Sequence, residues 1–392
     1  MNNNQNKMTH HLLKTPLLFM LLAIVAILFS VYGAVIMTET GQANNVNRTW
    51  VIFYYQYNWL FALISLVSLA MLIGMNEQYK LWKTSFLLIF SFVVIGSLLV
   101  ANLMVPMMFP DRQHDAQYIS ISDADKLLKE KESVYAVEIN GDAVAYPRRF
   151  IGLPHIAGTN IGGEDIVMTY CGLSGLPVVF SETYNGQPTK FEVLGQTHNN
   201  LLLVERKSGE LIQQITGVTE FSQSKLDTYA NQEMSWGTYK KLYPEGRVYL
   251  YKFDRTIDSR LIASFKPKLK KQYDPEQGPL FPTLALKDNR LNNKTRVWGV
   301  IANNKQAAYT KPYLQTMPLI NTKIDNIPIV VYYDKELDVV NFFKREINGQ
   351  VVKIAKIDTY GNSPQGKLER FPSYNGLMWM VWVHFYPETA LY

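Results

Sequence analysis

Two side chains with versatile chemistry lie sixteen positions apart in the middle of this 392-residue sequence. Cys171, the single cysteine, ends an apolar run at residues 166–170, and His155 precedes that run. A thiolate and an imidazole together suit borderline metal ions such as copper and zinc, and a histidine base can activate a cysteine nucleophile. The pair therefore predicts a metal site or a Cys/His nucleophile, with His198 and Arg206 as further candidate catalytic groups.

A structural role for these residues is the competing interpretation. Free cysteine is among the most buried residue types and packs as a small apolar side chain, and His155 then lies on a surface loop. The sequence has no His-Glu-x-x-His, no Gly-x-Ser-x-Gly, no phosphate-binding glycine loop and no paired-cysteine motif. A single cysteine also excludes an intrachain disulfide. Both interpretations stay open.

Three apolar segments without charged residues precede Pro106. They cover residues 16–37, 51–75 and 85–105, and each is close to the ~20 residues that a helix needs to cross a bilayer. A cleaved signal peptide is the alternative for the first segment, but no cleavage site stands out and two further spans follow. Residues 1–106 are therefore predicted to form three transmembrane helices, with the lipid bilayer as their partner.

The charges of the short loops predict the orientation. The N-terminal tail and the loop at residues 76–83 carry two lysines each, whereas the loop at 38–49 carries one arginine. The positive-inside rule places the tail and the second loop in the cytoplasm. The third span then leads outward, which predicts a cell (inner) membrane protein whose C-terminal domain is periplasmic or extracellular. The spans contain no Asp, Glu, Lys or Arg, so they are interpreted as an anchor.

The remaining sequence contains an internal repeat at a spacing of 163 residues. The matching pairs are 134–146 with 297–309, 166–170 with 329–333, and 185–187 with 348–350. A Trp and a Tyr-Pro pair near the end of each copy match at a spacing of 143, so the second copy lacks about twenty residues. The predicted segments are a linker at 107–121, repeat one at 122–254, an inter-repeat loop at 255–284 and repeat two at 285–392.

Each copy has the pattern of antiparallel sheet. The turns Asn140-Gly141, Asn185-Gly186 and Lys207-Ser208-Gly209 are flanked by apolar runs and predict hairpins. Short helices are expected from Ser122 to Lys131, behind a capping box, and from Gln232 to Leu242. The expected fold is a three-helix transmembrane anchor plus a mainly-β (α+β) domain built from two pseudo-symmetric repeats.

The two copies differ in their polar residues. Copy one has Cys171 where copy two has Asp334, and it has His155 after a proline where copy two has Leu319. It also keeps a hairpin at residues 198–217 that copy two has largely lost. If copy one carries a site, His155 and Cys171 should approach each other with His198 or Arg206 nearby.

The formal charge of +6 is scattered, and the densest basic cluster is Lys266-Pro-Lys-Leu-Lys-Lys271. A nucleic-acid or lipid-headgroup patch is one interpretation of this cluster, and a solvated inter-repeat loop is the favoured one. No aromatic residue is interleaved with these lysines as base stacking requires. No nucleic-acid partner is therefore predicted.

The sequence from about Ser122 to Tyr392 resembles the bacterial and archaeal family called domain of unknown function 3179. The residues that carry the resemblance are Ala145-Tyr-Pro147, His155, Thr169-Tyr-Cys171, Phe191-x-Val193-x-Gly195, Asn199-Asn200-Leu201, Glu205-Arg206 and Gln214…Gly217. The chain departs from the family pattern at Ile156, Gly172, Ser174 and Ile212. The resemblance implies the β architecture and supports His155 and Cys171 as candidate site residues. It names no reaction.

Two classes of function remain at this point. The favoured one is a membrane-anchored extracytoplasmic binding or assembly module of the cell envelope, with an envelope protein complex as a candidate partner. The alternative is an enzyme or metalloprotein centred on His155 and Cys171, with copper or zinc as the candidate cofactor. The favoured class rests on the fact that no complete catalytic set can be assembled from the sequence.

Overall fold

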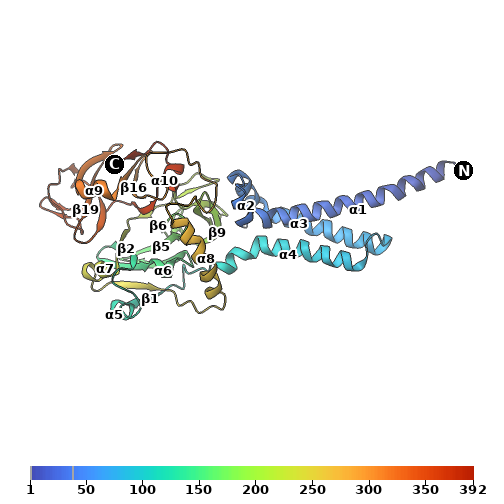
Figure 1. Ribbon diagram of the computed structural model, residues 1–392, viewed down its shortest axis with the longest axis horizontal. Coiled ribbons are helices and arrows are strands. Elements are labelled where there is room, and N and C mark those ends of the chain that lie inside the picture. The colour runs from blue at the N-terminus through green and yellow to red at the C-terminus, as the bar shows by residue number, and fades with distance from the viewer. Residues whose placement is uncertain (1, 38) are drawn as a thin grey trace. The chain divides into compact units, whose positions relative to one another are not determined.

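The N-terminal part of the protein is helical and the remainder is rich in β-sheet (Figure 1). The computed structural model describes residues 2–37 and 39–392, and it divides into unit 1, Met1–Met107, and unit 2, Met108–Tyr392. Unit 1 contains α1 (Asn2–Met37), α2 (Glu39–Ala43), α3 (Arg48–Tyr79) and α4 (Thr84–Met108), whose last residue is the first of unit 2.

The three apolar segments expected from the sequence are helical, and their length and composition suggest a membrane anchor. Three helical stretches are long and apolar enough to cross a membrane, namely Thr15–Ile36, Arg48–Tyr79 and Thr84–Met108. They pack through small and polar groups, as membrane helices do. The Ser65 hydroxyl donates to the backbone oxygen of Ala26 over 2.8 Å, and a Cβ at Gly33 would collide with the Tyr54 ring, so α1 and α3 approach closely.

The first half of unit 2 contains three sheets of four or five strands, ordered β1-β15-β3-β2-β14, β13-β6-β5-β4 and β12-β11-β10-β9. Its elements are β1 (Gln117–Ser120), α5 (Ile121–Ala124), β2 (Ser133–Ile139), β3 (Asp142–Pro147), α6 (Arg148–Ile151), β4 (Ile156–Ile161), β5 (Glu164–Cys171), β6 (Leu176–Ser181), β7 (Thr183–Tyr184), β8 (Gln187–Pro188), β9 (Phe191–Thr197), β10 (Asn200–Glu205), β11 (Leu211–Gln213), β12 (Val218–Thr219), β13 (Thr228–Tyr229), β14 (Gln232–Ser235), α7 (Trp236–Leu242) and β15 (Arg247–Leu250). The helix α8 (Asp258–Tyr273) follows.

The second half of unit 2 is shorter, and its larger sheets are ordered β25-β16-β17-β26 and β18-β19-β20. Its elements are β16 (Arg296–Ala302), β17 (Lys305–Thr310), α9 (Lys311–Thr316), β18 (Leu319–Ile324), β19 (Ile327–Asp334), β20 (Val339–Lys344), β21 (Glu346–Ile347), β22 (Gln350–Val351), β23 (Asn362–Ser363), β24 (Gly366–Lys367), β25 (Tyr374–Met378), α10 (Trp379–Phe385) and β26 (Ala390–Leu391).

The strand order is shared between the halves. The central hairpin β2–β3 has β14 antiparallel on one side and β15 parallel on the other, and β16–β17 has β25 and β26 in the same arrangement. Cys171 pairs with Leu176 at the end of the β5–β6 hairpin, and Asp334 pairs with Val339 at the end of β19–β20. Both pairs of positions differ by the 163 residues found in the sequence.

Each half also buries a tryptophan against an aspartate. The Trp236 indole donates to Asp125 over 2.8 Å, and the Trp379 indole donates to Asp288 over 3.3 Å. Both tryptophans are 0% exposed. A buried indole N–H needs such a partner, so this contact holds α7 and α10 in place.

The hairpin predictions are confirmed, with one qualification. β2 pairs with β3 around Asn140-Gly141, and β10 pairs with β11 around residues 206–210. The turn Asn185-Gly186 closes only the two-residue strands β7 and β8. The longer flanking strands β6 and β9 belong to different sheets, because the chain leaves one sheet for the other at this point.

Two predictions of helices were wrong in detail. The helix expected at 122–131 ends at Ala124. It is capped two residues earlier than expected, by Ser120, whose hydroxyl accepts from the Asp123 N–H. In the helix expected at 232–242, the first four residues form β14, because they complete the sheet beside β2. The helix α7 begins only at Trp236.

The inter-repeat segment, expected as a loop, contains the 16-residue helix α8. Pro267, within the basic cluster, lies inside this helix. A proline in a helix removes one backbone hydrogen bond. Burial of Leu261 and of Gln272, which is 0% exposed, offsets that loss by tying both ends of α8 to the sheets.

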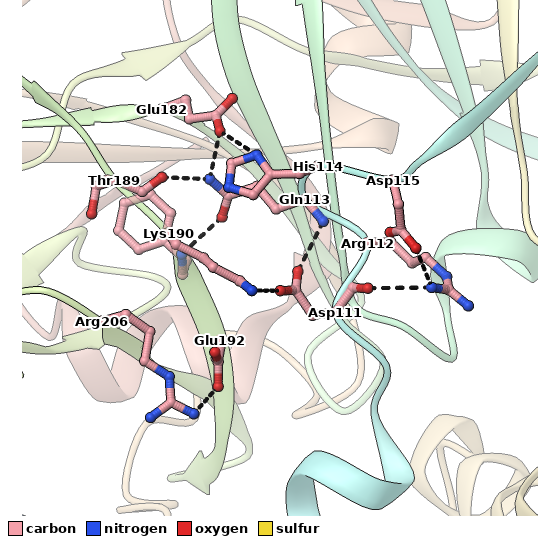
Figure 2. Close-up of polar contacts among 11 residues, drawn as sticks. Asp111, Arg112, Gln113, His114, Asp115, Glu182, Thr189, Lys190, Glu192 and Arg206 are labelled. Carbon is pink, nitrogen blue, oxygen red and sulfur yellow. Dashed lines mark hydrogen bonds and ion pairs between the residues drawn. The ribbon is translucent and has the colours of Figure 1, made fainter.

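The segment expected as a linker, 107–121, is pinned to the β domain (Figure 2). The Gln113 amide donates to Glu182 over 2.9 Å and to the Thr189 backbone oxygen over 2.7 Å. Its oxygen accepts from the Phe191 N–H over 2.8 Å. Gln113 is 2% exposed, so these buried groups satisfy one another and the segment is part of the folded domain.

Candidate functional site

Cys171 lies at the end of β5 and is 2% exposed. Its thiol donates a weak hydrogen bond to the backbone oxygen of Asn199, with a sulfur–oxygen distance of 3.8 Å. Burial raises the pKa of the Cys171 thiol, although a hydrogen bond with Ser174 acts in the opposite direction. The thiol is therefore neutral at pH 7, whereas a reactive cysteine needs a lowered pKa.

A network of buried amide and hydroxyl groups surrounds the thiol. The Asn200 amide donates to Gln214 over 3.0 Å, and its oxygen accepts from the Gln213 amide over 3.0 Å. Gln214 in turn donates to the Thr169 hydroxyl over 3.0 Å. The members of this amide network are less than 3% exposed and comprise Thr169, Ser174, Thr197, Asn199, Asn200, Gln213 and Gln214. Buried polar groups that are paired in this way fix one arrangement of the strands.

The amide network is joined to α8. The Gln272 amide donates to the Leu173 backbone oxygen over 2.6 Å, and its own oxygen accepts from the Leu280 N–H over 2.7 Å. The Asn199 amide donates to the Phe281 backbone oxygen over 2.7 Å. Residues 272–281 are thus held against the β5–β6 turn and the start of β10.

His155 lies in a different environment from Cys171. It has a left-handed φ of 64°, and its ring lies 4.7 Å from the Phe109 ring. Its Nδ1 is buried and has no hydrogen-bond partner in the part of the chain that the structure describes. Burial lowers the pKa of His155 to about 4, against a smaller opposite effect of its backbone contact with Tyr170.

The two central candidates face different neighbours. The His155 backbone oxygen accepts from the Tyr170 N–H over 2.8 Å, which places His155 opposite Tyr170 in the hairpin. Successive side chains of a strand point to opposite faces, so Cys171 points away from Tyr170. Across residues 2–37 and 39–392, no group of three or more His, Cys, Asp or Glu side chains is placed to hold a metal ion. The copper or zinc hypothesis stays a prediction that elemental analysis of the purified protein tests.

The other two candidates lie at opposite ends of β10. His198 precedes the strand, and its ring lies 4.3 Å from that of His384 in α10, whose Nδ1 accepts from the Ala285 N–H. Arg206 follows the strand and forms an ion pair with Glu192 on β9 (Figure 2). His198 thus lies at the end of β10 where Asn199 contacts the Cys171 thiol, and Arg206 lies at the opposite end of that strand.

A pocket that sequence reasoning missed lies beside the β5–β6 turn. It has a volume of about 620 Å³, within the range usual for ligand sites. Its lining residues are Glu132, Ser133, Arg148, Arg149, Gly152, Leu153, Tyr170, Gly172, Phe253, Ile262, Phe265, Lys266 and Leu269. We call it the Arg148 pocket. Its wall includes Gly172, the residue after Cys171, and four residues of α8.

Arg148 brings a positive charge to this pocket without a counter-ion. It begins α6, directly after β3, and its guanidinium lies 4.6 Å from the centre of the Tyr273 ring. Among the described residues, it has no hydrogen-bond acceptor and no ion-pair partner. Burial disfavours its charge, but Tyr170, Tyr273 and Glu233 favour it more strongly, and the pKa of Arg148 is raised. Glu233 itself forms an ion pair with Arg296.

In the second half of unit 2, the basic residue at the position that matches Arg148 has an acidic partner. Lys311 begins α9, directly after β17, and forms an ion pair with Asp338 over 2.6 Å. The Tyr333 hydroxyl also donates to Asp338 over 2.6 Å. Asp338 lies in the β19–β20 turn with a φ of 57°, and the same turn position between β5 and β6 is Gly175, with a φ of 72°. The counter-ion of the second half is therefore missing from the first.

The Arg148 pocket can bind an anion. A guanidinium presents planar donors that suit carboxylate and phosphate groups, and the apolar wall lowers the local dielectric, which strengthens the attraction. A signal for this site was present in the sequence. At the spacing of 163, Arg148 matches Lys311, whereas the position that matches Asp338 is Gly175, so the difference in charge can be read from the sequence.

The family of the chain follows from comparison with known proteins. A family model described as "Protein of unknown function (DUF3179)" matches residues 109–389, and the chain belongs to this family. The match begins at Phe109, just after the last apolar helix, and covers both halves of unit 2. The predicted resemblance is confirmed. No curated protein and no solved structure matches the chain.

Proposed function

We propose that this protein is a membrane-anchored binding module of the cell envelope whose ligand is an anion held by Arg148. The observation that carries the proposal is the guanidinium of Arg148, which lines a mostly apolar pocket and has no counter-ion among the described residues. Burial disfavours the charge of Arg148, and the nearby Tyr170, Tyr273 and Glu233 offset this effect without forming an ion pair with it among the described residues. A site that keeps such a charge is well suited to a ligand that supplies the opposite one.

A comparison of the two halves supports the same proposal. We propose that the halves are copies of one unit, supported by the common strand order and by hairpin registers at one spacing of 163. Copy two closes its cation site with Asp338. In copy one, a Cβ at Gly175 would lie 3.0 Å from the hydroxyl of Tyr273, the last residue of α8. This helix therefore occupies the space that an aspartate side chain at position 175 would need.

The test of the proposal measures binding of hexyl phosphate, a soluble anion with a short apolar tail, to the full-length protein in non-ionic detergent. We expect Arg148→Met to weaken binding about tenfold to a hundredfold, because a hydrogen-bonded pair with a charged group contributes about 1.5–3 kcal/mol. Methionine keeps the apolar stem and removes the charge. Isothermal titration calorimetry gives both affinities.

The matched control is Lys353→Gln, which removes one positive charge from an exposed position of the second half. It should leave the affinity unchanged. Equal binding by wild type and Arg148→Met, or an equal loss in both variants, would contradict a site at Arg148. The thermal midpoint of Arg148→Met should stay close to that of wild type, because within the described part of the chain Arg148 has no ion pair to lose.

We also propose that unit 2 lies outside the cytoplasm. Support comes from the excess of lysines in the N-terminal tail and in the loop at 76–83, together with three helices able to span. Alkaline phosphatase fused after Tyr392 should be active, since it folds only outside the cytoplasm. Green fluorescent protein fused at the same position should not fluoresce, since it requires the cytoplasm to fold. The opposite pattern would overturn the orientation.

A further inference from the structure

We infer that the ligand of the Arg148 pocket is an anionic phospholipid of the membrane in which the protein is anchored. This inference rests on the proposed anion site and adds the class of ligand. Its phosphate would pair with Arg148, and part of an acyl chain would cover the apolar wall. Three independent features of the pocket support this choice: its apolar lining, its basic edge and its connection to the third span.

The lining away from Arg148 is apolar and comes mainly from α8. The side chains are Leu153, Phe253, Ile262, Phe265 and Leu269. Ile262 is 41% exposed although it lies on an ordered helix and borders the pocket. Apolar area that faces water is unfavourable, and hydrocarbon would remove it from water. A small hydrophilic anion such as inorganic phosphate would leave this wall uncovered.

The edge of the pocket is basic. Arg149 and Lys266 join Arg148 in the lining, and the one acidic lining residue, Glu132, already forms an ion pair with Arg149 over 3.4 Å. The exposed face of α8 adds further cations, which are Arg260, Lys270 and Lys271. Clusters of lysine and arginine attract anionic lipid headgroups electrostatically.

The chain itself connects this pocket to the end of the third span. Met108 is the last residue of α4, and its backbone oxygen accepts from Arg255, over 3.0 Å, just before α8. The next residue, Phe109, stacks on Phe265 of the lining with ring centres 5.9 Å apart and planes at 10°. The residue that directly follows the third apolar helix in the chain therefore contacts the pocket wall.

The test uses the full-length protein in nanodiscs of zwitterionic dioleoyl phosphatidylcholine, into which dioleoyl phosphatidylglycerol is titrated. Native mass spectrometry after release into detergent counts bound lipid. We expect one phosphatidylglycerol to remain bound to wild type in preference to phosphatidylcholine. Arg148→Met should lower this occupancy about tenfold or more, since a charge-assisted contact is lost, and Lys353→Gln should not.

A second pair of variants tests the acyl chain. Ile262→Gln alters the pocket wall, and Leu286→Gln alters a side chain that is equally exposed, at 41%, outside the pocket. Only Ile262→Gln should reduce retention of phosphatidylglycerol, while both variants keep the affinity for hexyl phosphate within about threefold. Equal retention of phosphatidylcholine, or equal loss in Leu286→Gln, would overturn the inference.

The two proposals fail in different ways. If hexyl phosphate binds through Arg148 but no phosphatidylglycerol is retained, the lipid inference is wrong and the anion site stands. If neither probe depends on Arg148, both proposals are wrong. If phosphatidylglycerol is retained independently of Arg148, the lipid binds elsewhere on the protein and the inference is again wrong.

Discussion

Acidification from pH 7 to pH 4 should remove about 3 kcal/mol of stability through His155 alone, because burial lowers its pKa from an ordinary value of 6.5 to about 4. The unfolded chain then binds the proton before the folded one does. The contribution is therefore fully present above pH 6.5 and is lost progressively as the pH falls from 6.5 through 4. The measurement is the midpoint of urea unfolding of the full-length protein in detergent, across this range.

The control for this prediction is His155→Asn. Asparagine tolerates the left-handed φ of 64° at this position and does not titrate. The acidic groups contribute to the pH dependence of both proteins, so the difference between them isolates His155. We expect the variant to be less sensitive to pH between 6.5 and 4. Identical pH profiles for the two proteins would show that folding does not lower the pKa of His155, and would contradict the prediction.

Replacing Asn200 with alanine should destabilise unit 2 by about 3 kcal/mol. The side chain is 0% exposed, and its removal leaves the Gln214 oxygen and the Ile215 N–H without the partners they now have at 3.0 Å. Each buried polar group left unpaired costs about 1–3 kcal/mol. For a domain of this size the thermal midpoint should fall by about 6–12 °C, which differential scanning calorimetry measures.

Asn304→Ala is the matched control, because Asn304 is exposed in the β16–β17 turn. Its effect should stay within about 0.5 kcal/mol. A comparable loss of stability in both variants, or none in Asn200→Ala, would contradict the structural importance of the amide network. A large loss in Asn200→Ala alone would also explain why polar residues of the family pattern are buried here.

The elements that depend on neighbouring residues were predictable. The membrane helices follow from uncharged apolar runs of sufficient length. The hairpin at Asn140-Gly141 follows because that pair adopts the left-handed conformation of a tight turn, with φ values of 52° and 86°. The errors arose where the same local sequence pattern is compatible with both a helix and a strand. The apolar and polar residues at 232–235 fit a helix by pattern, but β2 offered them a strand partner.

The candidate site shows the same division more sharply. The sequence singled out His155 and Cys171 because their side chains are chemically versatile. Cys171 proves to be buried, and His155 is partly exposed, with a buried Nδ1. Arg148 drew no notice, since a single arginine is ordinary on a protein surface. Its importance depends on three facts about distant segments: Tyr273 lies 4.6 Å away, α8 forms the pocket wall, and Gly175 supplies no carboxylate.

The sequence by itself determined the three apolar helices, the β-rich domain, the family and the spacing of 163, because hydropathy, turn preference and repetition are written in the order of the residues. Only the tertiary structure decided that residues 258–273 form a helix, that this helix lines a pocket, and that Arg148 lines the same pocket with no counter-ion among the residues that the structure describes. The physical reason is that burial and charge pairing depend on which segments meet in space, and residues 148, 175 and 273 meet only after the sheets have formed.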